Sequence, residues 1–77
     1  MNKNAEYYLS LKYIYVIKKV HYKGEVFYQA THNELDKYAF YGVGSTPREA
    51  KADLDEVKKD LFSYYVNRGY EINEPDK

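Results

Sequence analysis

The stretch YGVGSTPREA, residues 41–50, decides the fold because it holds the end of one element and the start of the next. Thr46 and Glu49 satisfy the capping-box pattern, in which both side chains bond to free backbone groups at a helix start. Pro47 falls at the first helical position, where its missing N–H costs nothing. The stretch therefore predicts a strand, a tight turn and a helix that begins near Thr46.

The glycines of this stretch do not make a phosphate-binding loop. A dinucleotide fingerprint needs a third glycine, but Thr46 or Pro47 stands in its place. Pro47 also removes an amide that such a loop would point at a phosphate. No Gly-Lys-Ser/Thr ending of a P-loop follows. We interpret Gly42 and Gly44 as a joint between strand and helix.

The helix after Thr46 is the clearest element of the chain. Its apolar positions follow 3.6-residue spacing and predict one stripe, made of Ala50, Leu54, Val57, Leu61, Tyr64 and Tyr65. Phe62 falls off this stripe. We expect the helix to pack on one face of a sheet through Leu54, Val57 and Leu61.

The helix should end near residue 68. Gly69 supplies a C-terminal stop, and Arg68 is well placed for the helix dipole. Beyond it, YEI (residues 70–72) fits a short fourth strand.

Three strands are expected before the helix. Residues 11–22 and 26–32 are rich in β-branched and aromatic side chains, and the glycine between them marks a hairpin turn. Residues 33–37 are turn chemistry, and residues 38–44 form the third strand. The predicted fold is α+β, a three-stranded antiparallel sheet packed on one long helix. One domain, residues 11–74, follows a loose N-terminal arm, residues 1–10.

Composition narrows the function classes. The chain has 77 residues, and a core of that size is thin. It has no cysteine and no apolar run that could span a membrane, so a cytoplasmic protein without disulfides is expected. Twelve basic and twelve acidic residues cancel, which gives no overall field for nucleic acid. Eleven tyrosines favour interfaces, because tyrosine is apolar along its body and polar at its tip.

The order of the elements resembles the HicB-like antitoxin family. The pieces that carry the resemblance are GEVFYQA, NELDK, GVGSTPREA and the closing GYEINEP, and it covers residues 11–75. The resemblance implies a truncated RNase-H-like fold with the order β-β-β-α-β. It also implies a partner, a small RNA-cleaving HicA-like toxin that the domain binds and blocks. The family's usual C-terminal DNA-binding segment does not follow, so a stand-alone relative without operator binding is expected.

No catalytic, cofactor or metal site is predicted. RNase-H-type catalysis needs carboxylates from strand and helix around a divalent metal, and residues 11–22 contain no acid. His21 and His32 are expected to be surface residues beside turns, without a partner constellation for catalysis.

Two candidate partner-binding surfaces remain. Tyr13, Tyr15 and Ile17 share one side of the first strand, and the other side is also apolar. One helix can cover only one face of such a sheet. Tyr13, Tyr15 and Ile17 are therefore expected to be buried in a homodimer or a higher oligomer, although the N-terminal arm is an alternative cover.

The second surface lies on the helix. Four acids fall along one edge of the apolar stripe, at Glu49, Asp53, Glu56 and Asp60. They form either a solvated, charge-mixed face or an acidic ridge that meets a basic, RNA-binding partner.

The sequence thus predicts a non-enzymatic protein-binding module, a HicB-like antitoxin or a relative. One alternative is a single-stranded nucleic-acid-binding domain, because YVIKKVHYK interleaves aromatic and basic residues. Another is an inhibitor, for instance one carried by a phage, that reuses the fold against a different target.

Overall fold

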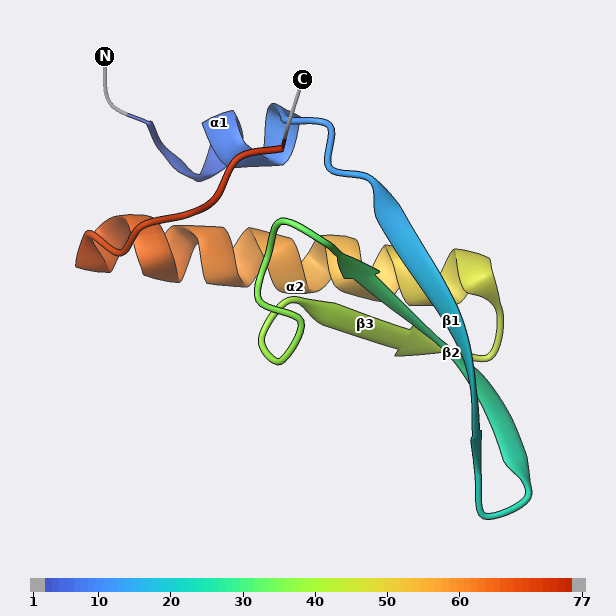
Figure 1. Cartoon of the computed structure of the whole chain (residues 1–77). Helices are drawn as coiled ribbons and strands as arrows, with labels where there is room; N and C mark the ends of the chain where they lie inside the picture. The colour runs from blue at the N-terminus through green and yellow to red at the C-terminus, as the bar shows by residue number, and fades with distance from the viewer. Residues whose placement is uncertain (1–2, 76–77) are drawn as a thin grey trace.

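The computed structural model describes residues 3–75. Its elements are α1 (Ala5–Ser10), β1 (Tyr15–Tyr22), β2 (Glu25–His32), β3 (Tyr41–Gly44) and α2 (Pro47–Arg68) (Figure 1). The strands form one antiparallel sheet in the order β1-β2-β3, and α2 packs across one of its faces. The predicted α+β class, with its three-stranded sheet and long helix, is confirmed.

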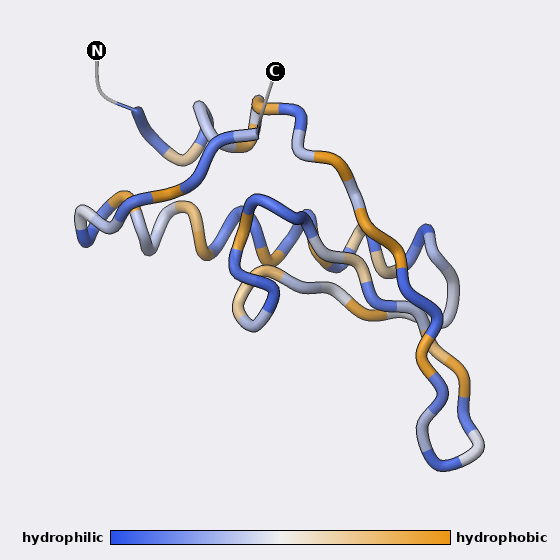
Figure 2. The backbone as a smooth tube through the Cα atoms, viewed as in Figure 1, coloured by the Kyte–Doolittle hydropathy of each residue, from blue (hydrophilic) through white to orange (hydrophobic). Residues whose placement is uncertain are grey.

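β1 and β2 form a long hairpin whose turn end extends beyond α2 (Figure 1). The strands pair from Tyr15 with His32 to Tyr22 with Glu25. The two connecting residues both have positive φ, 49° at Lys23 and 79° at Gly24. Such a type I′ turn matches the twist of the flanking strands, so the predicted hairpin is confirmed. Hydrophobic positions continue along both strands into the extended part (Figure 2).

β1 and β3 are shorter than predicted. Pairing begins only at Tyr15 in β1 and at Tyr41 in β3. Before β3, the Phe40 amide donates to the Asp36 carbonyl at 2.7 Å. This local turn uses backbone groups that a longer ladder would need, and it delays the strand.

α2 begins and ends where its capping residues predict. The Thr46 hydroxyl accepts a hydrogen bond from the Glu49 amide at 3.1 Å, and Pro47 lies in the first turn. At the other end, Gly69 takes the left-handed conformation with φ 73°, and its amide bonds to the Tyr65 and Val66 carbonyls. These local contacts fix the helix length.

Gly42 and Gly44 are the points at which β3 lies directly on α2. A Cβ atom at Gly42 would come within 2.5 Å of the Ala50 carbonyl oxygen, and one at Gly44 within 2.7 Å of the Ala50 amide nitrogen. No side chain fits there, so the absence of a Cβ allows the close approach. The two glycines thus belong to the packing of strand against helix.

The buried stripe of α2 differs from the predicted one. The buried positions are Ala50, Leu54, Lys58 and Phe62. Ala50 and Leu54 were expected. Val57 and Leu61 are only partly buried, Tyr64 is exposed, and Phe62 was placed off the stripe. Phe62 is buried because its ring lies beside those of Tyr8, Tyr13 and Phe40, which come from α1, the segment before β1 and the segment before β3. Lys58 is buried as well, and its ammonium lies 3.3 Å from Asp55 Oδ1.

The predicted N-terminal arm, of which residues 1–2 lie outside the described residues, is not loose from residue 5 to residue 10. Ala5–Ser10 form α1, which packs against α2, and the Tyr8 ring lies 5.6 Å from the Phe62 ring. Asn4 caps this helix by accepting from the Tyr7 amide at 2.9 Å. The segment therefore covers the second half of α2 rather than the second face of the sheet.

The predicted fourth strand is wrong. Residues 70–72 pair with no strand of the described chain, and the tail runs back along the end of α2 towards α1 (Figure 1). Ile72 is nevertheless buried in the core, and the Tyr13 hydroxyl donates to the Asn73 carbonyl at 2.5 Å. Side-chain contacts hold this tail, so its apolar residue needs no backbone ladder.

Candidate functional site

The face of the sheet that points away from α2 exposes the apolar side chains Val16, Tyr41 and Val43. We name it the open face, and its strand residues are Val16, Lys18, Val20, Phe27, Gln29, Thr31, Tyr41 and Val43. The pairing register sets Val16, Thr31 and Tyr41 side by side. Tyr41 and Val43 are each 43% exposed, and no helix within residues 3–75 covers them. A sheet face this apolar is unusual next to water.

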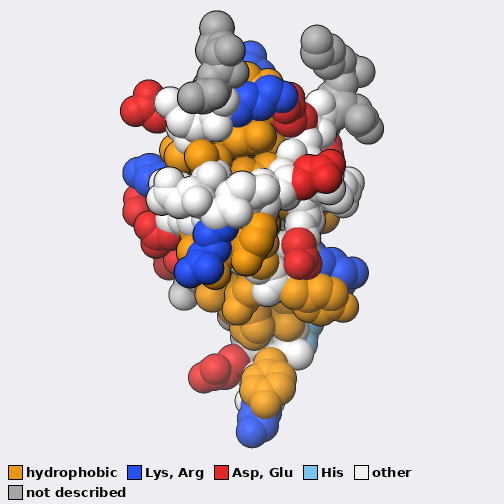
Figure 3. Space-filling view, turned by 90° about the vertical axis from the view of Figure 1, so that its left-hand side faces the viewer, with side chains coloured by type: hydrophobic (Ala, Val, Ile, Leu, Met, Phe, Trp, Pro, Cys, Tyr) orange, Lys and Arg blue, Asp and Glu red, His pale blue; other side chains and the backbone are white. Residues whose placement is uncertain are grey.

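Hydrophobic side chains also reach the surface away from the sheet centre. Seen from the end where α2 finishes, hydrophobic side chains are exposed on the body of the molecule and again at the hairpin end, with charged side chains among and around them (Figure 3). Ile14, just before β1, is 70% exposed, and Tyr22 is exposed at the hairpin turn.

A shallow groove of about 430 Å³ crosses one end of the open face. Its lining residues are Val16, Lys18, Gln29, Thr31, Asn33, Lys37 and Tyr38. Two of them are lysines and none is an acid. The Lys37 ammonium lies 5.7 Å from the centre of the exposed Tyr38 ring. The groove therefore offers positive charge and an aromatic ring next to apolar surface.

The predicted tyrosine face lies on the opposite side of the sheet. Tyr13 is 5% exposed and belongs to the core, while Tyr15 and Ile17 pack against that core under α2. The prediction that these three residues form the uncovered face is wrong. Both sides of the first strand are apolar, so alternation alone could not tell which side the helix would cover.

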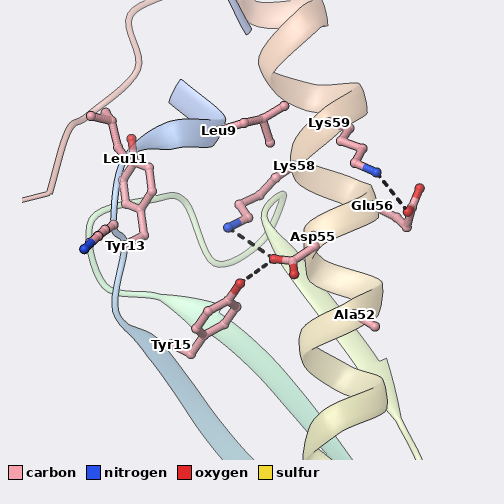
Figure 4. Close-up of a pocket in the computed structure, with 10 residues that line it drawn as sticks. Leu9, Leu11, Tyr13, Tyr15, Ala52, Asp55, Glu56, Lys58 and Lys59 are labelled. Carbon is pink, nitrogen blue, oxygen red and sulfur yellow. Dashed lines mark hydrogen bonds and ion pairs between the residues drawn. The ribbon is translucent and has the colours of Figure 1, made fainter. Parts of the chain in front are cut away.

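Tyr15 is held by two charged side chains of α2 (Figure 4). Its hydroxyl donates to Asp55 Oδ1 at 2.5 Å, and Lys58 Nζ lies 3.3 Å from the same oxygen. The Lys58 ammonium also lies 5.1 Å from the centre of the Tyr15 ring. Burial and, after it, the Asp55 carboxylate raise the pKa of Tyr15 to about 12. Its proton stays on the hydroxyl at neutral pH, so Tyr15 ties the strand to the helix and is a poor base.

His32 is a buried residue, not the surface residue that the sequence suggests. It is 1% exposed, and the Tyr13 and Tyr15 rings lie 5.4 and 4.7 Å from its ring. Nδ1 lies 2.8 Å from the Ile14 carbonyl oxygen, which assigns the proton to Nδ1. Burial lowers the pKa of His32, so the ring is neutral. His21, by contrast, is exposed in the hairpin.

A second groove of about 630 Å³ lies between the start of β1 and α2 (Figure 4). Its lining residues are Leu9, Leu11, Lys12, Tyr13, Tyr15, Ala52, Asp55, Glu56, Lys58 and Lys59. Leu9, Leu11 and the two tyrosines make the α1 and β1 side mostly apolar, although Lys12 also lines it, and α2 contributes four charged side chains and Ala52. The sequence reasoning did not foresee it, because it depends on how α1 closes over α2.

The four predicted acids of α2 all face solvent: Glu49, Asp53, Glu56 and Asp60. Two of them have partners within the chain. The Asp53 carboxylate accepts from the Val43 amide at 2.9 Å, and Glu56 pairs with Lys59 at 3.3 Å. The structure thus brings Asp53 to the outer edge of β3, and both interpretations of the acidic ridge stay open.

Tyr41 and Val43 are exposed residues of the open face that sequence reasoning missed. The signal was present in YGVG, where the large side chains alternate with the two glycines. Because Gly42 and Gly44 pack on α2, their neighbours must point to the open face.

Two other kinds of functional feature, a metal site and a membrane-spanning helix, were sought within residues 3–75. No three His, Cys, Asp or Glu side chains gather there into a group that could hold a metal ion. No helix there is long and apolar enough to cross a membrane. Comparison with protein families, with curated proteins and with solved structures found no match to this chain.

Proposed function

We propose that the chain is a non-enzymatic protein-binding module that docks a partner protein on its open face. The observation that supports this is the apolar sheet surface opposite α2, centred on Val16, Tyr41 and Val43. Apolar side chains there gain free energy only when a partner removes them from water. Val16, Tyr41 and Val43 do not pack against α2, because α2 lies on the other face, so packing within the chain does not explain their large apolar side chains.

The partner class follows from the resemblance to HicB-like antitoxins. In this proposal the partner is a small RNA-cleaving toxin, and the module covers its active surface and excludes RNA. The strand-strand-strand-helix order is compatible with that role. The exposed acids of α2, Glu49 and Asp60 among them, would attract a basic RNA-binding protein and speed its association.

The test is inhibition of RNA cleavage by a HicA-like toxin, with binding measured by titration calorimetry. Tyr41→Glu should abolish inhibition, because it places a charge in a contact that loses its water. Tyr64→Glu is the matched control, since Tyr64 is 46% exposed but lies on α2 away from the open face. If Tyr41→Glu inhibits the toxin as well as Tyr64→Glu and the unchanged protein do, the open face is not the binding surface.

A second candidate function rests on the groove of the open face. Lys18, Lys37 and Tyr38 together offer charge for phosphates and a ring for base stacking, as single-strand-binding surfaces do. Binding of a single-stranded oligonucleotide should then weaken steeply as salt rises, whereas an apolar protein contact should not. A salt titration of both ligands separates the two functions.

A further inference from the structure

The two edges of the sheet differ in how they are protected. β3 has four residues, and α2 blocks its edge because Asp53 accepts from the Val43 amide at 2.9 Å. β1 has eight residues, and within residues 3–75 it pairs only with β2. A long unprotected edge is a ready template for another strand.

The register identifies the backbone groups that the β1 edge offers. Tyr22 and Glu25 flank the two-residue turn and form a hydrogen-bonded pair, and such pairs alternate along an antiparallel ladder. The β1 residues that lie between successive hydrogen-bonded pairs direct their N–H and C=O groups away from β2. In β1 these residues are Tyr15, Ile17, Lys19 and His21.

The charge along this edge selects its partner. Residues 11–23 contain the lysines Lys12, Lys18, Lys19 and Lys23 and no acid. Like charges placed opposite each other on neighbouring strands are destabilising, which disfavours pairing of β1 with a second copy of itself. Opposite charges in the same positions are stabilising. The edge is therefore suited to an acidic strand.

The groove of about 630 Å³ lies at the start of the same strand. A strand added beside β1 alternates its side chains between the two faces of the sheet. Side chains on the α2 side would lie at the mouth of this groove, where Leu9, Leu11 and Ala52 offer apolar contacts (Figure 4). Backbone pairing would give affinity, and the groove would give side-chain preference.

We infer that the β1 edge takes an extended acidic segment of a protein partner as a fourth strand of the sheet. The inference rests on the proposed function in that the occupant belongs to a protein partner. The surface itself is separate from the open face, and it can be tested without the whole partner.

The probe is a synthetic ten-residue peptide that alternates glutamate with valine or threonine, compared with the same peptide carrying lysine for glutamate. With isotope-labelled protein, the acidic peptide should protect the Ile17 and Lys19 amides from hydrogen exchange. Two or three opposite-charge pairs should make its binding about tenfold tighter than that of the lysine peptide. Equal binding of both peptides would overturn the inference, as would protection confined to β3.

Charge reversal provides the decisive variant. Lys18→Glu/Lys19→Glu should reverse the preference, so that the lysine peptide binds more tightly. Arg48→Glu/Arg68→Glu changes the net charge equally at exposed positions near the two ends of α2 and should leave the preference unchanged. Reversal by the α2 variant as well would mean that net charge alone selects the peptide, which contradicts edge pairing.

A backbone variant complements the charge test. Lys19→Pro removes an outward amide and should abolish protection of the edge by the acidic peptide. Circular dichroism checks that the variant folds, and the charge-reversal result stands alone if it does not.

Other occupants give distinct results. Sedimentation that reveals dimers, broken by Lys19→Pro, would assign the edge to a second copy and overturn the inference. Displacement of the acidic peptide by a single-stranded oligonucleotide would do the same for a nucleic acid. Tyr41→Glu separates this inference from the proposed function, because it should stop toxin inhibition while leaving peptide binding intact.

Discussion

The two faces of the sheet use the same three strands in opposite ways. On the face under α2, Ala30 and Gly42 are buried, because the helix backbone approaches closely. On the open face, their neighbours Thr31 and Tyr41 lie next to solvent. At this point of the sheet a large exposed side chain, Tyr41, thus adjoins a glycine whose backbone lies against α2. The difference supports the proposal that a partner protein binds the open face.

The comparison predicts its largest effect at the junction of α2 with α1. Phe62 is fully buried and its ring lies near those of Tyr8, Tyr13 and Phe40. Phe62→Ala should lower the free energy of unfolding by about 3–5 kcal/mol, since it removes the ring and leaves a cavity. Denaturant unfolding measures this. If Phe62→Ala lowers the free energy of unfolding less than Leu61→Ala does, the buried stripe of α2 passes through Leu61, as the sequence predicted.

The next effect tests the close approach of strand and helix. Gly42→Ala places a methyl group against the Ala50 carbonyl and the Leu54 backbone, and backbone atoms cannot move aside cheaply. We expect a loss of about 1–3 kcal/mol from overpacking. Gly24→Asn in the hairpin turn is the control, because Gly24 has open space and asparagine tolerates its positive φ. Equal losses of unfolding free energy at both sites would mean that the close approach of β3 to α2 adds nothing to the cost at Gly42.

Sequence reasoning performed best where contacts are local. Thr46, Pro47 and Gly69 determine the ends of α2 through bonds to residues within one turn, so the pattern alone predicted them. Whether the Tyr15 side of β1 is covered, and whether Phe62 is buried, depend instead on which side of the strand the helix occupies. Alternation is symmetric when both sides are apolar, so the pattern could not choose. Ile72 shows the same limit, because an apolar residue in a tail can be buried without a strand.

His32 should make stability depend on pH in a defined window. Its pKa is lowered in the folded state, so as pH falls below about 6.5 the unfolded chain binds a proton that the folded chain does not. Stability is therefore lost as pH falls from about 6.5 towards the lowered pKa, with a slope of at most about 1.4 kcal/mol per pH unit. Above that window His32 contributes no pH dependence.

The variant His32→Gln should flatten this slope between pH 7 and pH 5.5, because an amide can donate to the Ile14 carbonyl but does not titrate. The exposed His21→Gln should leave the slope as it is. Denaturant unfolding at several pH values checks both. An unchanged slope in His32→Gln would assign the acid sensitivity to other groups.

The smallest effect is expected for Val16→Thr on the open face of β1, and its neighbour Ile17 on the other face provides the comparison. Ile17→Thr places a hydroxyl towards the core and should cost about 1–3 kcal/mol, because that hydroxyl loses its water. Val16→Thr keeps nearly the same shape on the open face, and a surface substitution should stay within about 0.5 kcal/mol. This near-neutrality holds only if the isolated chain leaves the open face in water. A second copy packed there would bury Val16, and the melting temperature would then rise with protein concentration. Val16→Thr would in that case cost more at high concentration than at low concentration. Thermal unfolding of both proteins at two widely separated concentrations therefore decides between a face kept for a different protein and a face buried in a homodimer.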